Sequence, residues 1–186
     1  MRWLAGLIGL TILGAPAVAT AGDASCVWRA LPEDARAQAL KNSSENSDSF
    51  FGGIKEEVLG GAVVACVALP RNERAADKIL VTVSVALAAY VMQLDAEASL
   101  KKEFNIEPTA LERAYGTIDP RRRADLGAKV MVGKKPSEVT MTAVTQAIAV
   151  AYPAVDLDAP DKDAGAGYVM SYFMARAMRD QTEPKF

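Results

Sequence analysis

Residues 79–94 read ILVTVSVALAAYVMQL, a run of sixteen positions without a charged side chain. A helix that is apolar on every face is normally buried, whereas a surface helix shows only an apolar stripe. The segment from Ile79 to Leu94 is therefore predicted to be the buried central helix, within a helical pattern from about Arg71 to Phe104. Two alternatives stay open. Residues 79–85 are β-branched and alternate like a strand, and the uncharged run falls only a little short of the roughly eighteen residues of a membrane span.

Proline and glycine divide the rest of the chain into shorter helical segments. Pro108 and Pro120 stand where helices begin, and Gly116 and Gly133 stand where helices end. These signals predict an all-α fold of six or seven helices in an irregular or orthogonal bundle, with residues 22–186 forming a single domain. Besides the central helix, we expect helices over residues 32–40, 50–69 (or 54–69 after a Gly52-Gly53 loop), 108–116, 120–132, 136–152 and 164–179, with a frayed tail at 181–186.

The first 21 residues have the order of a secretory signal peptide. Arg2 precedes an apolar run from Trp3 to Leu13, and small residues follow with Ala-x-Ala patterns at 17–19 and 19–21. The sequence therefore predicts a secreted or periplasmic protein. An uncleaved membrane anchor is disfavoured by the glycine and proline in the last third of this segment. A lipoprotein is disfavoured by the aspartate at position 23, close before Cys26.

Two cysteines, Cys26 and Cys66, remain after removal of a signal peptide. Exported proteins fold in oxidising compartments, so an even number of cysteines favours a Cys26–Cys66 disulfide. The alternative is that Cys66, within the apolar stretch VVACV, is a buried free thiol.

The composition excludes several classes of function. The chain contains no histidine, which rules out Ser-His-Asp and Cys-His catalytic sites and removes the commonest metal ligand. Loss of residues 1–21 removes one basic residue and no acidic one, leaving 20 basic and 23 acidic residues and a net charge of −3. This mild acidity argues against nucleic acid as a partner. We expect no cofactor, no metal and no stable membrane span after signal cleavage.

Arg121, Arg122 and Arg123 form a cluster that local physics disfavours. If Asp119 caps the following helix, three cations lie at the positive end of its dipole. One interpretation is pairing with Glu112, Asp119 or Asp125; the other is contact with an anionic ligand or an acidic partner surface.

Two further patterns have a structural and a chemical interpretation. Methionines recur every four residues at 170, 174 and 178, beside Tyr168, Tyr172 and Phe173. They are interpreted as a core stripe, with a Cu(I) site as the alternative. The carboxylate pairs are interpreted as solvated helix faces, although glycoside hydrolysis also uses two acids; they are Glu56/Glu57, Asp95/Glu97 and Glu103/Glu107.

These observations favour an exported, non-enzymatic binding or interaction protein, such as an envelope inhibitor, an immunity-type protein or a chaperone-like factor. Its protein partner and oligomeric state are left open. The alternatives are a small envelope glycoside hydrolase with paired carboxylates and a carrier of an apolar ligand, which would have a sizeable cavity beside the buried helix.

The Ala-x-Ala patterns predict where the mature chain begins. N-terminal sequencing of exported protein should start at Thr20 or Gly22. An intact Met1 on membrane-bound protein would contradict the prediction of a cleaved signal.

Overall fold

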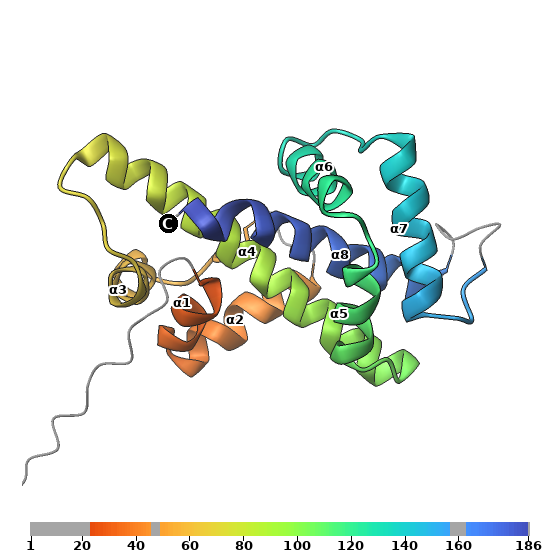
Figure 1. Ribbon diagram of the computed structural model, residues 1–186. Coiled ribbons are helices and arrows are strands. Elements are labelled where there is room, and N and C mark those ends of the chain that lie inside the picture. Colours follow the sequence, from red (N-terminus) through yellow and green to blue (C-terminus); the bar gives the residue numbers. More distant parts are fainter. Residues whose placement is uncertain (1–22, 46–48, 157–162, 186) are drawn as a thin grey trace, which may run out of the picture.

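The computed structural model describes residues 23–45, 49–156 and 163–185, so the expected signal peptide lies outside the described residues. The described residues form eight α-helices and one 3₁₀ turn and contain no strand (Figure 1). The all-α fold is confirmed. The helices are α1 (Ala24–Ala30), α2 (Glu33–Ser44), α3 (Glu56–Cys66), α4 (Glu73–Phe104), α5 (Pro108–Gly116), α6 (Pro120–Met131), α7 (Glu138–Ala151) and α8 (Ala164–Thr182), followed by η2 (Glu183–Lys185).

The long helices α4 and α8 pack against each other and form the centre of the bundle. Helices α1 and α3 lie at one end of this pair and α5, α6 and α7 at the other, while α2 packs along α4 (Figure 1). Two groups of buried side chains result. The first includes Val27, Trp28, Leu31, Val63, Leu87 and Val91, and the second includes Leu100, Leu111, Tyr115, Val144, Tyr172 and Phe173.

The ends of α4 have local causes. The Asn72 side chain accepts a hydrogen bond from the Ala75 amide, which caps the first turn. At the other end Asn105 adopts a left-handed conformation with φ 55°, and the Ile106 amide donates to the Leu100 carbonyl. The predicted long helix is confirmed, and the strand alternative for residues 79–85 is wrong.

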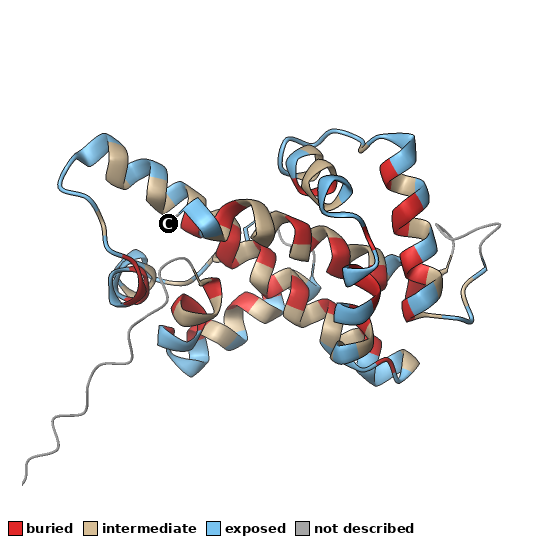
Figure 2. Cartoon of the chain, in the orientation of Figure 1, coloured by how far each residue is buried: buried red, intermediate tan, exposed pale blue. Residues whose placement is uncertain are grey.

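The prediction that α4 is buried on every face needs correction. Ala86, Leu87, Ala89 and Val91 are buried, but Val81 is 65% exposed. The first turns of α4 extend beyond its neighbours, and Figure 2 shows exposed residues there. Among the helices of the described residues, α4 alone is long and apolar enough to cross a membrane, yet in this fold it is the core helix of the bundle.

Several boundaries also differ from expectation. Helix α1 was not expected, because its seven residues are too few to show a period. Helix α2 continues to Ser44. Helix α3 begins at Glu56 after a turn in which Gly53 has φ 81°, so the alternative of a Gly52-Gly53 loop is confirmed, and it ends at Cys66, before the expected residue 69. The expected frayed tail is instead helical to Thr182, which is 1% exposed.

The expected pairing of Cys26 with Cys66 is present and joins α1 to the last residue of α3. The bond closes a loop across 40 positions of sequence. In the chain-entropy model, a loop of this size stabilises the folded state by about 4 kcal/mol. The disulfide lies beside Val63 and fixes α3, which otherwise packs mainly against α1.

Helices α6 and α8 meet at Gly127. A Cβ atom at this position would lie 2.3 Å from the carbonyl oxygen of Ala177 and 2.9 Å from Cγ of Gln181. A backbone oxygen cannot move away as a flexible side chain can, so the two helices approach this closely only with glycine at position 127.

Gly127→Ala should therefore push α6 away from α8. We expect a loss of about 1–3 kcal/mol, with roughly 2–4 °C lower Tm for each kcal/mol. Gly167→Ala on α8 is the matched control, because no atom lies within 4 Å of its added Cβ. Equal melting temperatures for both variants in a calorimetric scan would show that the close contact does not stabilise the fold.

Candidate ligand-binding groove

The arginine cluster lies on the first turn of α6, where Asp119 accepts a hydrogen bond from the Arg121 amide at 2.9 Å. Arg121 and Arg122 are exposed, and neither forms an ion pair with an acidic residue in the described part of the chain. Arg123 instead places its guanidinium 5.3 Å from the centre of the Tyr115 ring. A cation–π contact thus offsets part of its unfavourable position.

The acidic residues expected to pair with the cluster have other partners. Glu112 binds Arg176 and accepts a hydrogen bond from Tyr172. Asp125 accepts hydrogen bonds from Ser137 and Thr140. That Arg121, Arg122 and Arg123 meet an anionic ligand or an acidic partner surface stays a prediction.

The three methionines of the α8 stripe do not all have the same surroundings. Tyr172 and Phe173 are fully buried in the core, as a core stripe requires. Met170 and Met174 are only half-buried, and together with Met141 of α7 they line a groove that does not include Met178. Met170 and Met174 still pack against the core cluster, so they belong to the expected core stripe and also line the groove.

This groove lies between α6, α7 and α8 and has a volume of about 320 Å³. Its wall is almost wholly apolar and includes no acidic residue among those described. Lys134 and Lys135, both exposed, stand at its edge. The complete lining consists of Leu126, Val130, Gly133, Lys134, Lys135, Pro136, Met141, Met170 and Met174.

The end of α6 places the two lysines at the groove. Gly133 adopts the left-handed region with φ 64°, and its amide donates to the Val130 carbonyl. The Lys134 amide donates to the Lys129 carbonyl, which completes a Schellman motif. The predicted stop at Gly133 is confirmed, and it turns the chain so that the two lysines follow directly.

Asp125 of α6 forms hydrogen bonds with the start of α7, across the loop that connects these two helices. Its Oδ2 accepts from the Thr140 hydroxyl at 2.7 Å, from the Ser137 hydroxyl at 2.9 Å and from the Ser137 amide at 3.1 Å. These hydrogen bonds, that of Thr140 most of all, hold the pKa of Asp125 below its usual value.

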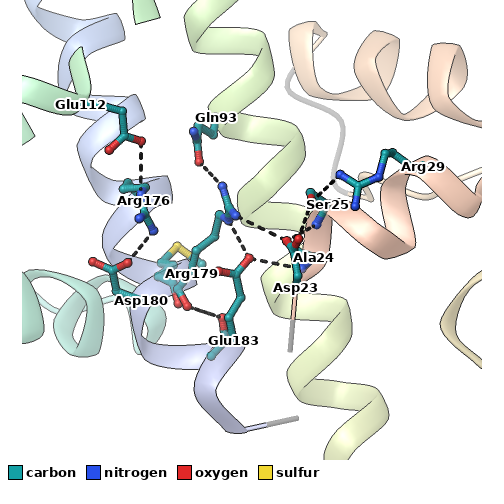
Figure 3. A network of polar contacts seen from close by, with 12 residues as sticks. Asp23, Ala24, Ser25, Arg29, Gln93, Glu112, Arg176, Arg179, Asp180 and Glu183 are labelled. Carbon is teal, nitrogen blue, oxygen red and sulfur yellow. Dashed lines mark hydrogen bonds and ion pairs between the residues drawn. The ribbon is translucent and has the colours of Figure 1, made fainter. Parts of the chain in front are cut away.

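Helix α8, which carries Met170 and Met174, is held in place by two arginines (Figure 3). Arg176 binds Glu112 of α5 at 3.3 Å and Asp180 of its own helix. The Asp180 carboxylate also accepts a hydrogen bond from the Tyr115 hydroxyl at 2.8 Å. The contacts to α5 therefore restrain α8 from one side.

Arg179 connects α8 to α4 and to the N-terminal helix. Its guanidinium donates to Gln93 of α4 at 2.6 Å and to Glu183 at 2.8 Å, and lies 3.9 Å from Asp23 (Figure 3). Glu183 in turn accepts from the Ala24 amide at 3.2 Å. The tail that was expected to fray is thus tied to the first described helix.

The carboxylate pairs identified from sequence are not brought together around the groove. Asp95 accepts a hydrogen bond from Ser43, whereas Glu97 accepts one from Gln93. Glu103 and Glu107 are exposed, and Glu107 binds Lys101. Glu56 and Glu57 lie exposed in the first turn of α3.

Comparison with protein-family models, with characterised proteins and with solved structures found no match to this chain. The chemistry of the groove must therefore be argued from its own residues. Sequence reasoning missed Met141, Lys134 and Lys135, because only the packing of three helices brings them to the thioethers of α8.

The low pKa of Asp125 leads to a pH-dependent stability. A carboxyl whose pKa is lowered by folding stabilises the native state above its unfolded pKa of 3.8, and this contribution is lost as the pH falls below that value. Asp125→Asn should lower Tm at neutral pH, with the difference shrinking below pH 3.8. Asp77→Asn, at an exposed position of α4, is the control in the same melting series. A difference that is independent of pH would contradict this role of Asp125.

Proposed function

We propose that this protein is an exported, non-enzymatic binding protein whose methionine-lined groove takes the hydrocarbon chain of an amphiphile with an anionic head group. The observation that carries the proposal is the combination of an almost wholly apolar wall with two lysines at its edge. The disulfide fits an oxidising extracellular compartment, which supports export.

Methionine suits a ligand of variable shape. Its side chain is unbranched and polarisable, so it adapts to irregular apolar surfaces. Met141, Met170 and Met174 come from two different helices and are half-buried before any ligand arrives. Binding a chain against them removes further apolar surface from water.

The same thioethers could hold Cu(I), but the surroundings favour an apolar chain. A metal needs a small site with converging ligands, whereas this groove has a volume of about 320 Å³. The ammonium groups of Lys134 and Lys135 would repel a cation, and they attract an anion. The positive charge at the edge of the groove and the size of the groove therefore both favour an amphiphile with an anionic head group over Cu(I).

The expected affinity follows from the chain length. Burying each CH₂ group is worth about 0.8 kcal/mol, so ten of them contribute roughly 8 kcal/mol. Loss of translational and rotational freedom costs at least about 4 kcal/mol of this. Each lysine at the edge adds roughly 0.2–1 kcal/mol for a carboxylate head group, since exposed ion pairs are weak.

The test is calorimetric titration of the mature, oxidised protein with three ligands of equal chain length: dodecanoate, dodecan-1-ol and dodecyltrimethylammonium. We expect dodecanoate to bind most tightly and the cationic ligand least tightly. Lys134→Gln/Lys135→Gln should weaken dodecanoate by about three- to tenfold and leave dodecan-1-ol unchanged. Arg74→Gln/Lys78→Gln removes the same charge from exposed positions of α4 and serves as the control.

A second pair of variants tests the wall. Met170→Gln/Met174→Gln keeps the side-chain length but adds polar groups, and it should weaken all three ligands alike. Met131→Gln, at an exposed residue outside the groove, should change none of them. Dodecanoate binding that survives the double methionine substitution would overturn the proposal. The proposal would also be overturned if peptides with an apolar helix face bound and none of the three dodecyl ligands did.

A further inference from the structure

A second hollow lies between α2, α4 and α8, on residues that the groove does not use. Its volume is about 350 Å³, and hydroxyl side chains make up much of its lining. Ser99 of α4 and Tyr168 and Ser171 of α8 contribute hydroxyls, and Asp95 of α4 contributes the single carboxylate among the described residues of the lining. We call this hollow the hydroxyl pocket.

The polar groups of the hydroxyl pocket have unused hydrogen-bonding capacity. Within the described part of the chain, the hydroxyls of Ser99, Tyr168 and Ser171 have no hydrogen-bond partner. Asp95 accepts only one bond, from the Ser43 hydroxyl at 3.2 Å. A carboxylate has room for about four such bonds, and each hydroxyl can both donate and accept.

The apolar part of the lining is small and includes an aromatic ring. Phe50 contributes its ring from the segment between α2 and α3, beside Met92 of α4. Ligand sites typically combine such apolar surface with a few polar groups, in volumes of about 300–1,000 Å³. The hydroxyl pocket has a volume in this range, and its lining is more polar than that of most such sites.

We propose that the hydroxyl pocket binds a neutral polyhydroxylated ligand of the saccharide class. Sugar hydroxyls can donate to Asp95 and exchange hydrogen bonds with Ser99, Tyr168 and Ser171, while a C–H face of the ring packs on Phe50. An anionic ligand is excluded by the carboxylate. A metal is disfavoured because no group of three histidine, cysteine, aspartate or glutamate residues gathers within the described residues.

The pocket binds without cleaving. Hydrolysis of a glycosidic bond generally requires two carboxyl groups on either side of that bond. Asp95 is the single acidic residue among the described residues that line the pocket. Burial raises the pKa of Asp95 and the Ser43 hydrogen bond only partly offsets this, so further donors from a ligand would stabilise the carboxylate.

The experiment records amide shifts by NMR on the mature, oxidised protein titrated with maltose, cellobiose and N,N′-diacetylchitobiose, with glucosamine as a cationic probe. We expect at least one of the three neutral disaccharides to shift the amides of Ser99 and Ser171. Its dissociation constant should be on the order of 1 mM or tighter. Ser99→Ala/Ser171→Ala should weaken this binding by about tenfold, because each lost hydrogen bond is worth a few-fold.

Two control variants test whether the sugar binds in the hydroxyl pocket itself. Ser84→Ala removes a hydroxyl of the same helix that bonds the Leu80 carbonyl outside the pocket, and it should leave the affinity unchanged. Met170→Gln/Met174→Gln should also bind the sugar normally, because the groove is a separate site. Shifts with glucosamine alone would reassign the pocket to cations and overturn the proposal. No shift at Ser99 and Ser171 with any of the three disaccharides would overturn it as well.

Discussion

The packing of α8 along α4 is the constraint on which the rest of the structure depends. Helix α8 presents different side chains in each direction: Tyr172 and Phe173 to the core, Met170 and Met174 to the groove, and Tyr168 and Ser171 to the hydroxyl pocket. A rotation of α8 about its axis would move all three sets together. The two candidate sites therefore share one structural element and one set of restraints.

Those restraints are mainly polar and partly buried, which makes them specific. The Arg179 side chain is 12% exposed and Glu183 is 19% exposed, so both charges have lost most of their water. Burying charges is costly unless each one is paired and hydrogen-bonded. Gln93, Asp23 and the Tyr90 ring, whose centre lies 4.6 Å from the guanidinium, complete the surroundings of Arg179. A rotation of α8 about its axis would move Arg179 away from these groups.

Local signals in the sequence were sufficient for elements whose ends are determined by a few neighbouring residues. The proline and glycine positions bounded α5 and α6 closely, and the uncharged run identified α4. Features that depend on tertiary contacts could not be predicted from the sequence. Val139, an apolar residue in the first turn of α7, is 60% exposed. The groove and the hydroxyl pocket arise where three helices meet, and no single segment encodes either one. The Cys26–Cys66 pairing could be predicted from the even number of cysteines and an expected oxidising compartment. The hydrogen-bond and ion-pair partners of Glu112 and Asp125 could not be predicted in this way.

The hydrogen bond from the Ala24 amide to Glu183 spans 159 positions of sequence. It joins the first described helix to nearly the last residues of the chain. In any process that delivers the chain with its N-terminus leading, α1 emerges long before Glu183 and Arg179 exist beside it. Contacts between such distant residues form late, since the intervening loop must be closed first. The native surroundings of Asp23 and Ala24 can therefore assemble only after Arg179 and Glu183 have been delivered.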